Sequence, residues 1–177
     1  MIVKMNNKDY NPVPKMFRGM NITPHFTWDE MLGSAALLAH NKAHDTEYRN
    51  VPTQEEYNNI TFLCEQLESL RAITGKPLII NSGFRSDFCN KLVGGVPTSR
   101  HRLGLAADIH CEDTQHALCL AYWASTMMYS REIIIEKKTH AGKTSFWLHY
   151  SVDRNETLGC RIGFCINGIQ SYLSFPK

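Results

Sequence analysis

The sequence lacks any long apolar run. No stretch of its 177 residues approaches the length of about eighteen consecutive apolar residues that a membrane-spanning helix needs. The N-terminal segment also has no apolar core of the kind that a signal peptide carries. We therefore expect a chain without a membrane span that is synthesised in the cytoplasm.

Strong charge of either sign is also missing. The formal net charge is +2, and no segment gathers Lys and Arg into a basic patch, so we expect no nucleic-acid partner. Hydrophobic residues make up 43% and charged residues 20%, as in an ordinary globular chain of single-domain size. We predict an irregular, proline-containing lead-in over residues 1–25 and one domain over residues 26–177, acting as a monomer.

The six cysteines include no Cys-x-x-Cys pair. In a chain without an export signal, buried free thiols are the expected state. A structural zinc site built on Cys160 and Cys165 is the alternative, but it needs two further ligands that the sequence does not indicate.

Helical patterns dominate the first half of the chain. Thr27 with Glu30, and Thr53 with Glu56, match the capping box that opens a helix. The apolar spacing behind these caps predicts helices over residues 28–40 and 53–75. Shorter helices are expected over residues 86–92 and 113–129.

Strand patterns dominate the second half. Strands are expected over residues 77–81, 105–110, 132–136, 146–152, 161–167 and 170–174, and Asn167–Gly168 is a hairpin turn signal. Helices followed by strands indicate an α+β fold, in which an antiparallel sheet has helices packed mainly on one face.

Two histidines and one aspartate are candidate metal ligands. His101 and Asp108 flank Gly104, which allows the chain to bend, and His149 arrives from a later strand. Two imidazoles and one carboxylate suit a catalytic zinc ion, with one position left open for water. His110 is a rival ligand because it shares a strand face with Asp108. The helical His-Glu-x-x-His pattern is absent.

Longer sequence motifs narrow the choice of metal ligands. They are Ser82-Gly83-Phe84-Arg85-Ser86, Ser99-x-His101-x-x-Gly104-x-Ala106-x-Asp108 and Trp147-x-His149. These strings resemble the zinc D-alanyl-D-alanine carboxypeptidase family, which includes phage L-alanyl-D-glutamate endopeptidases and shares its fold with the Hedgehog signalling domain. The resemblance spans roughly residues 26–152, and residues 26–31 resemble the opening of the small phage members.

The resemblance implies a Hedgehog-type fold that holds one zinc ion through His101, Asp108 and His149. Arg85 resembles the family arginine that contacts the substrate near the scissile bond, a task that suits a planar guanidinium. Ser99 would lie near the metal and the substrate. A structural ion pair for Arg85 and a plain turn for Ser99 are the alternatives.

The general base departs from the family pattern. Many members carry Asp or Glu three residues before the last histidine, where this chain has Phe146. If residues 132–136 and 146–152 form a hairpin, Glu136 can lie opposite Trp147 on the His149 face. A register shift of one residue would turn Glu136 to the other face, and Glu132 with it. We predict Glu136 as the base, with a solvated strand charge as the alternative.

The expected activity is zinc-dependent hydrolysis of peptide bonds in peptidoglycan stem peptides, as a carboxypeptidase or an endopeptidase. By analogy with the phage members, the chain would act at the bacterial cell wall, in host lysis or as part of a virion. Two alternatives stay open. One is a non-catalytic zinc-binding structural or receptor-binding module on the same fold, and the other is a small-molecule dipeptidase. The direction in which Glu136 points relative to the metal separates enzyme from module.

Overall fold

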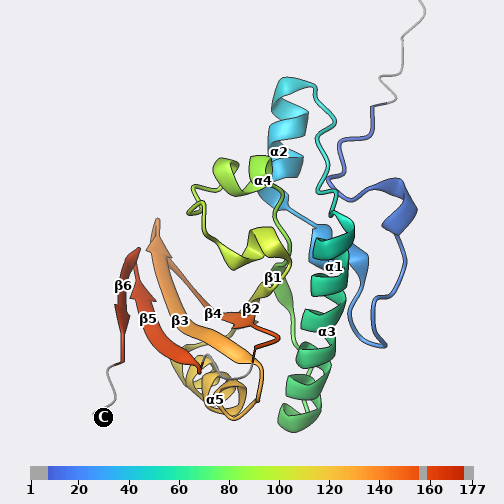
Figure 1. Cartoon of the computed structure of the whole chain (residues 1–177). Helices are drawn as coiled ribbons and strands as arrows, with labels where there is room; N and C mark the ends of the chain where they lie inside the picture. Colours follow the sequence, from blue (N-terminus) through green and yellow to red (C-terminus); the bar gives the residue numbers. More distant parts are fainter. Residues whose placement is uncertain (1–7, 156–158, 174–177) are drawn as a thin grey trace, which may run out of the picture.

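The computed structural model describes residues 8–155 and 159–173 (Figure 1). The helical elements are η1 (Lys15–Phe17), α1 (Trp28–Leu32), α2 (Ala35–His44), α3 (Gln54–Thr74), α4 (Asp87–Leu92), η2 (Arg100–Leu103) and α5 (Thr114–Ser125). The strands are β1 (Ile80–Ser82), β2 (Ala106–Cys111), β3 (Ser130–His140), β4 (Lys143–Val152), β5 (Arg161–Ile166) and β6 (Ile169–Tyr172). Most helices precede most strands, and the predicted α+β class is confirmed.

The strands form one sheet in the order β1-β2-β4-β3-β5-β6. Every neighbouring pair is antiparallel except β3 and β5, which are parallel, so the expectation of an antiparallel sheet needs correction at this one pair. The reason is positional. β4 ends beside the start of β3, where Val152 pairs with Ser130, and β5 begins at the same end, where Arg161 pairs with Glu132. β5 therefore runs in the direction of β3.

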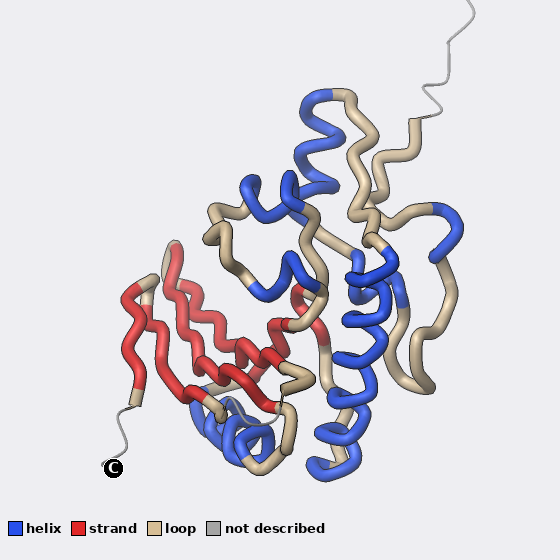
Figure 2. Tube along the Cα trace, viewed as in Figure 1, coloured by secondary structure: helices blue, strands red, loops and turns tan. Residues whose placement is uncertain are grey.

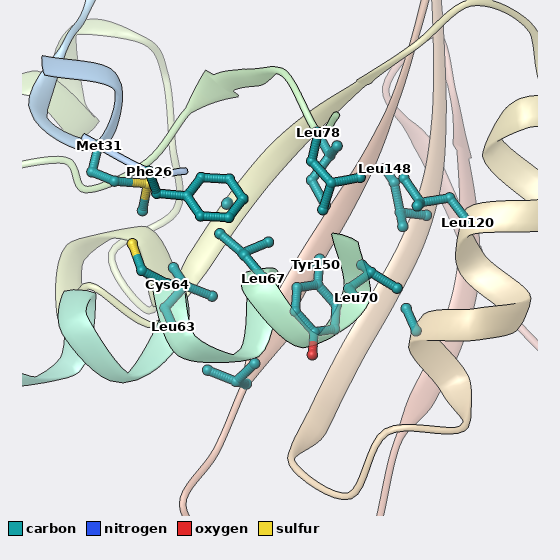
Figure 3. Packing of buried hydrophobic residues seen from close by; sticks show 14 of the residues in the cluster. Phe26, Met31, Leu63, Cys64, Leu67, Leu70, Leu78, Leu120, Leu148 and Tyr150 are labelled. Carbon is teal, nitrogen blue, oxygen red and sulfur yellow. The ribbon is translucent and has the colours of Figure 1, made fainter. Parts of the chain in front are cut away.

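The two faces of the sheet differ in chemistry because side chains alternate along each strand. Ile133, Ile135, Leu148 and Tyr150 are at most 5% exposed and belong to one apolar cluster with residues of α3 and α5. Figure 3 shows Leu67 of α3 within this cluster. Burying such side chains stabilises the fold by about 1.5–3 kcal/mol each. The opposite face of the same strands carries polar and charged residues, and we call it the front face.

Figure 2 shows the sheet as one block, with α5 against it and the long α3 beside it. Within the described residues, no helix is long and apolar enough to cross a membrane. The lead-in predicted for residues 1–25 contains only the short η1 from residue 8 onward, and residues 1–7 lie outside the described part of the chain.

The two predicted capping boxes are confirmed. The side chains of Thr27 and Thr53 each accept a hydrogen bond from the backbone N–H three residues ahead, and the glutamates at Glu30 and Glu56 complete the box. Gly75 ends α3 in the left-handed conformation (φ 65°), which glycine adopts without steric cost.

The helix predicted over residues 28–40 is in fact two helices. Gly33 has an extended backbone (φ −64°, ψ 143°), and the Ser34 hydroxyl caps α2 by accepting from the Leu37 N–H at 3.2 Å. A Gly-Ser pair inside an apolar pattern can therefore end one helix and start the next, because serine competes well for the N-cap position. The apolar spacing alone does not indicate this break between the two helices.

The hairpin of β3 and β4 is longer than predicted. Ala141 and Gly142 form a two-residue turn with positive φ at both positions (49° and 77°), as a type I′ turn requires. The predicted Asn167–Gly168 turn between β5 and β6 has the same form (φ 51° and 86°) and is confirmed. Ser174, the predicted end of the last strand, lies outside the described residues.

Other element boundaries move by a few residues. β1 begins at Ile80, not at residue 77, and α5 ends at Ser125, not at residue 129. The cysteines are free, as expected, and three of them (Cys64, Cys89 and Cys111) are buried. Cys119 is exposed, and Cys160 and Cys165 are partly exposed, so burial describes only half of the set.

Candidate metal centre

Three side chains converge on the front face where β2 pairs with β4. Asp108 and His149 are direct partners in this antiparallel pair, and His101 reaches them from η2. Asp108 Oδ1 lies 3.1 Å from His101 Nε2 and 3.0 Å from His149 Nδ1, and the two imidazole nitrogens are 3.2 Å apart. The predicted ligand residues are thus brought together, and each is at most 9% exposed.

His101 is oriented by the turn that follows it and by a backbone carbonyl. Gly104 takes the left-handed conformation (φ 70°) at the end of η2, and an added Cβ there would lie 2.8 Å from the Glu56 carbonyl oxygen. The Nδ1–H of His101 donates to the Gly83 carbonyl at 2.7 Å. This bond fixes the tautomer and leaves the Nε2 lone pair facing the cluster.

The donor set fits a metal ion. His101 Nε2 and Asp108 Oδ1 are both acceptors, and acceptors 3.1 Å apart repel each other unless a proton or a cation lies between them. Burial lowers the pKa of His101, which disfavours the proton. The ligand atoms of all three residues lie within 4.8 Å of one another, which is compatible with bonds of roughly 2 Å to one ion. Two imidazoles and a carboxylate are a suitable set for zinc.

The charge of Asp108 is stabilised from several sides. Its burial raises the pKa, but His101, His149 and their hydrogen bonds outweigh this effect and hold the pKa of Asp108 well below its ordinary value. Burial likewise lowers the pKa of His149, while the hydrogen bond and the charge of Asp108 raise it overall. An ionised carboxylate at the centre of the cluster is the form that binds a cation.

Arg85 lies against the cluster. Its Nη2 donates to Asp108 Oδ2 at 2.6 Å and its Nε donates to the Ser82 hydroxyl at 2.9 Å. Asp108 therefore presents Oδ1 to the histidines and Oδ2 to a guanidinium. The alternative predicted for Arg85, a structural ion pair, is present, and the same side chain also lines the cavity above the cluster.

A cavity of about 710 Å³ lies over the front face. Its wall includes Ser99 and the loop over residues 93–96 on one side, and β3, β5 and β6 on the other. His101, Asp108 and His149 are part of this lining. The cluster is therefore open to a ligand on one side while its other sides are buried.

Glu136 points into this cavity. It pairs with Trp147, as the proposed hairpin register predicts, so its side chain shares the front face with His149. Burial and then the nearby charge of Asp108 raise the pKa of Glu136 above its ordinary value. Hydrogen bonds from the Trp147 indole and the Cys165 thiol oppose this rise. A carboxylate with a raised pKa beside a metal site is suited to proton transfer.

Glu132 is a functional candidate that the sequence reasoning missed. It lies on the same face as Glu136, four residues away along β3, and its Oε2 is 3.7 Å from His149 Nε2. Its Oε1 accepts hydrogen bonds from Arg161 and from the Tyr172 hydroxyl, both at 2.6 Å. The period-two alternation of a strand, applied to both glutamates, could have identified it.

Two other candidates lie outside the cluster. His110 is exposed on β2, opposite Trp147, and is not among the converging ligand atoms. Cys160 and Cys165 do not belong to a cluster of candidate metal ligands: within residues 8–155 and 159–173, three or more His, Cys, Asp or Glu side chains converge only at His101, Asp108 and His149.

The chain has sequence similarity to known peptidases. The chain is similar to the zinc D-Ala-D-Ala carboxypeptidase of Streptomyces albus G, with 49% identity over 45 residues. That match covers 25% of this chain and only 18% of the relative. A family model described as Peptidase M15 matches residues 24–140, which is 117 of the 177 residues. On this match, the chain belongs to the peptidase M15 family.

Proposed function

We propose that the chain is a zinc-dependent peptidase that hydrolyses peptide bonds in the stem peptides of peptidoglycan. The observation that carries this proposal is the convergence of His101, Asp108 and His149 at a cavity that also contains Glu136. Membership of the M15 family and the partial likeness to a zinc D-Ala-D-Ala carboxypeptidase support the choice of metal and substrate class.

His101 Nε2, Asp108 Oδ1 and His149 Nδ1 would hold one zinc ion. When bound, zinc polarises the scissile carbonyl and lowers the pKa of a coordinated water toward about 7. The Gly83 carbonyl keeps the His101 proton on Nδ1, so that Nε2 remains available. The apolar cluster behind the sheet holds β2 and β4 in register.

Glu136 supplies the general base in this proposal. Its carboxylate accepts a proton from the attacking water and returns it to the departing amine, which completes the hydrolysis. Burial favours this role because it raises the pKa of Glu136 and so makes the carboxylate a stronger base. Phe146, three residues before His149, packs against the apolar core, so that position supplies no base and the role falls to Glu136.

Arg85 and Ser99 are the proposed substrate contacts. Within the described part of the chain, the hydrogen bonds of the Arg85 guanidinium use Nε and Nη2. Nη1 remains for a carbonyl or carboxylate of the substrate, while the bond to Asp108 holds the planar group in place. Ser99 lines the cavity at the start of η2.

The direct test uses zinc-loaded protein and purified peptidoglycan. The wild type should release free D-alanine if it is a carboxypeptidase, or new amino termini without free D-alanine if it is an endopeptidase. Glu136→Gln should lower the rate by at least about 10²-fold and still bind zinc. Glu65→Gln, which changes an exposed glutamate of α3, serves as the matched control and should leave the rate unchanged.

Two results would contradict the proposal. Zinc-bound wild type that releases neither product would support the non-catalytic zinc-binding module, which the phenylalanine at position 146 favours. Zinc affinity that is unchanged in His101→Ala would show that the cluster is not the zinc site.

The further proposal of a phage-type role at the bacterial cell wall, carried by a domain over residues 26–177, predicts that the protein lyses cells when directed to the periplasm.

A further inference from the structure

The β5–β6 hairpin lies beyond the residues that the family model matches, yet it forms one wall of the cavity. β5 pairs with β3 so that Arg161 lies beside Glu132. Tyr172 of β6 also reaches this point, because β6 pairs with β5 on its outer side. Two side chains of the hairpin thus meet a glutamate that borders the candidate metal centre.

Glu132 is anchored by one of its two oxygens. Arg161 Nη2 and the Tyr172 hydroxyl both donate to Oε1 at 2.6 Å. The two donors support each other, since the Arg161 guanidinium lies 4.9 Å from the centroid of the Tyr172 ring and Gln170 Nε2 donates to the Tyr172 hydroxyl at 2.6 Å. The Glu132 side chain is only 14% exposed. Its remaining oxygen, Oε2, therefore has little freedom to turn away.

This remaining oxygen faces the far side of the His149 ring. Oε2 of Glu132 is 3.7 Å from His149 Nε2, slightly beyond hydrogen-bond length, while Nδ1 of the same ring faces Asp108 and His101. An imidazole that binds a metal through Nδ1 must carry its proton on Nε2. A carboxylate behind Nε2 stabilises that tautomer, as the Gly83 carbonyl does for His101.

We propose that Glu132 is a positioning residue for the metal centre, which is anchored by Arg161 and Tyr172 and holds His149 in the orientation and tautomer that bind the metal through Nδ1. This inference rests on the proposed function only in requiring a metal at the cluster. It assigns a role to the C-terminal hairpin: Arg161 and Tyr172 act on the metal through Glu132 and do not touch it.

The conservative variant Glu132→Gln tests this role sharply. Arg161 and Tyr172 are donors, so they select the amide oxygen and leave the amide NH₂ facing His149 Nε2. When His149 Nε2 carries its proton, this N–H and the amide NH₂ face each other as two donors and repel. The variant therefore disfavours the metal-binding tautomer while it keeps the size and shape of the side chain.

The first measurement is zinc affinity, by competition with a coloured chelator. Glu132→Gln should weaken zinc binding by about 10–100-fold, which is typical when a partner behind a ligand is lost. Tyr172→Phe removes one of the two anchoring donors and should weaken binding by a smaller factor. The matched control is Glu136→Gln on the same face of the same strand, which should lose peptidase activity and keep wild-type zinc affinity.

The second measurement is the nitrogen-bound proton of His149 in the zinc-loaded protein, by NMR. In the wild type the Nε2 proton should resonate far downfield and exchange slowly with water. In Glu132→Gln it should move upfield and exchange faster. A glutamate that only supports the local fold would not move this signal in a variant whose circular dichroism is unchanged.

The outcomes separate the two proposals. Wild-type zinc affinity and an unshifted His149 signal in Glu132→Gln overturn the positioning role, whatever the activity. If Glu132→Gln does not fold, the same two readouts on Tyr172→Phe decide, and wild-type values there overturn the role as well. Zinc affinity that persists in both His101→Ala and His149→Ala instead overturns the metal centre, and with it the proposed function.

Discussion

The two glutamates on the front face of β3 have different surroundings. Glu132 is held by a guanidinium and a phenol, so one of its oxygens is occupied by strong donors. Among the described residues, the hydrogen bonds that act on the pKa of Glu136 come from an indole and a thiol, while burial raises that pKa. A group that accepts and returns a proton must be free to change its charge, which favours Glu136 as the base and Glu132 as a fixed support.

Replacing Trp147 by phenylalanine should change the pH dependence of the proposed peptidase activity. The indole N–H donates to the Glu136 carboxylate and thereby lowers the pKa of Glu136. Its loss raises that pKa, so more Glu136 is protonated and unable to act as a base at a given low pH. We expect the acid limb of the kcat/KM profile to move to higher pH in zinc-loaded Trp147→Phe.

The control for this experiment is Trp123→Phe, which changes a half-exposed tryptophan of α5 on the other side of the sheet. Its pH profile should match that of the wild type. An acid limb that stays in place, or moves to lower pH, in Trp147→Phe would mean that Glu136 does not carry the titration that controls activity.

The candidate metal ligands followed from the family resemblance, since spacing alone left His110 as a rival ligand. Glu136 followed from an argument about strand register that the structure bears out. The same register argument places Glu132 on the face of Glu136, but it indicates no partner for Glu132. The role proposed for Glu132 depends on Arg161 and Tyr172, whose approach to Glu132 requires the parallel pairing of β3 and β5.

At the scale of elements, Arg100 ties η2 to the end of β4. Its Nη2 donates to the Val152 carbonyl and to Asp153 Oδ2, the latter at 2.8 Å. Arg100 precedes His101, and Val152 follows His149 by three residues. This contact therefore joins the two elements that carry the imidazoles.

Asp153→Asn should loosen this connection and lower the free energy of unfolding by about 0.5–1 kcal/mol at neutral pH. Burial raises the pKa of Asp153, but the Asn155 N–H and the Arg100 guanidinium outweigh it and lower the pKa overall. The stabilisation is thus present above the unfolded pKa of about 3.9 and is lost as the pH falls through the lower folded value. Urea unfolding of chelator-treated protein at several pH values measures this difference.

The matched control is Asp87→Asn, since Asp87 also pairs with an arginine, Arg102, but has a side chain that is 70% exposed. We expect a smaller effect there. A difference between wild type and Asp153→Asn that grows as the pH falls below about 4 would contradict the assigned sign.

Local capping signals predicted where α1 and α3 begin, because a cap depends on residues only three positions apart. They did not reveal the break at Gly33, since the apolar pattern continues across it. The parallel pairing of β3 with β5 was equally out of reach. It depends on the chain placing β5 along the edge of β3 that β4 leaves free, and no local sequence pattern indicates this placement.

At the scale of the whole molecule, the candidate ligands belong to one folded unit. The unfolded chain cannot hold them together, so metal binding adds to the stability of the folded state. Adding zinc at 100 times its dissociation constant contributes about 2.7 kcal/mol. For a chain of this size, that corresponds to a rise in Tm of roughly 5–10 °C, which chelation should reverse.

Scanning calorimetry with and without zinc tests this expectation. The zinc-dependent rise in Tm should vanish in His101→Ala, when the Tm of this variant with zinc is compared with its Tm without zinc. A rise of equal size in that variant would indicate that zinc stabilises the protein somewhere else.

The separation of the ligands along the chain also has a consequence for timing. His101 and Asp108 leave the ribosome together, but His149 lies on β4 and the hairpin that anchors Glu132 follows later still. A nascent chain that has emerged only through β3 has two ligands and no closed site. Under the proposed function, hydrolytic capacity would therefore arise only after β4 has emerged, and chains that stop before β4 would be inert.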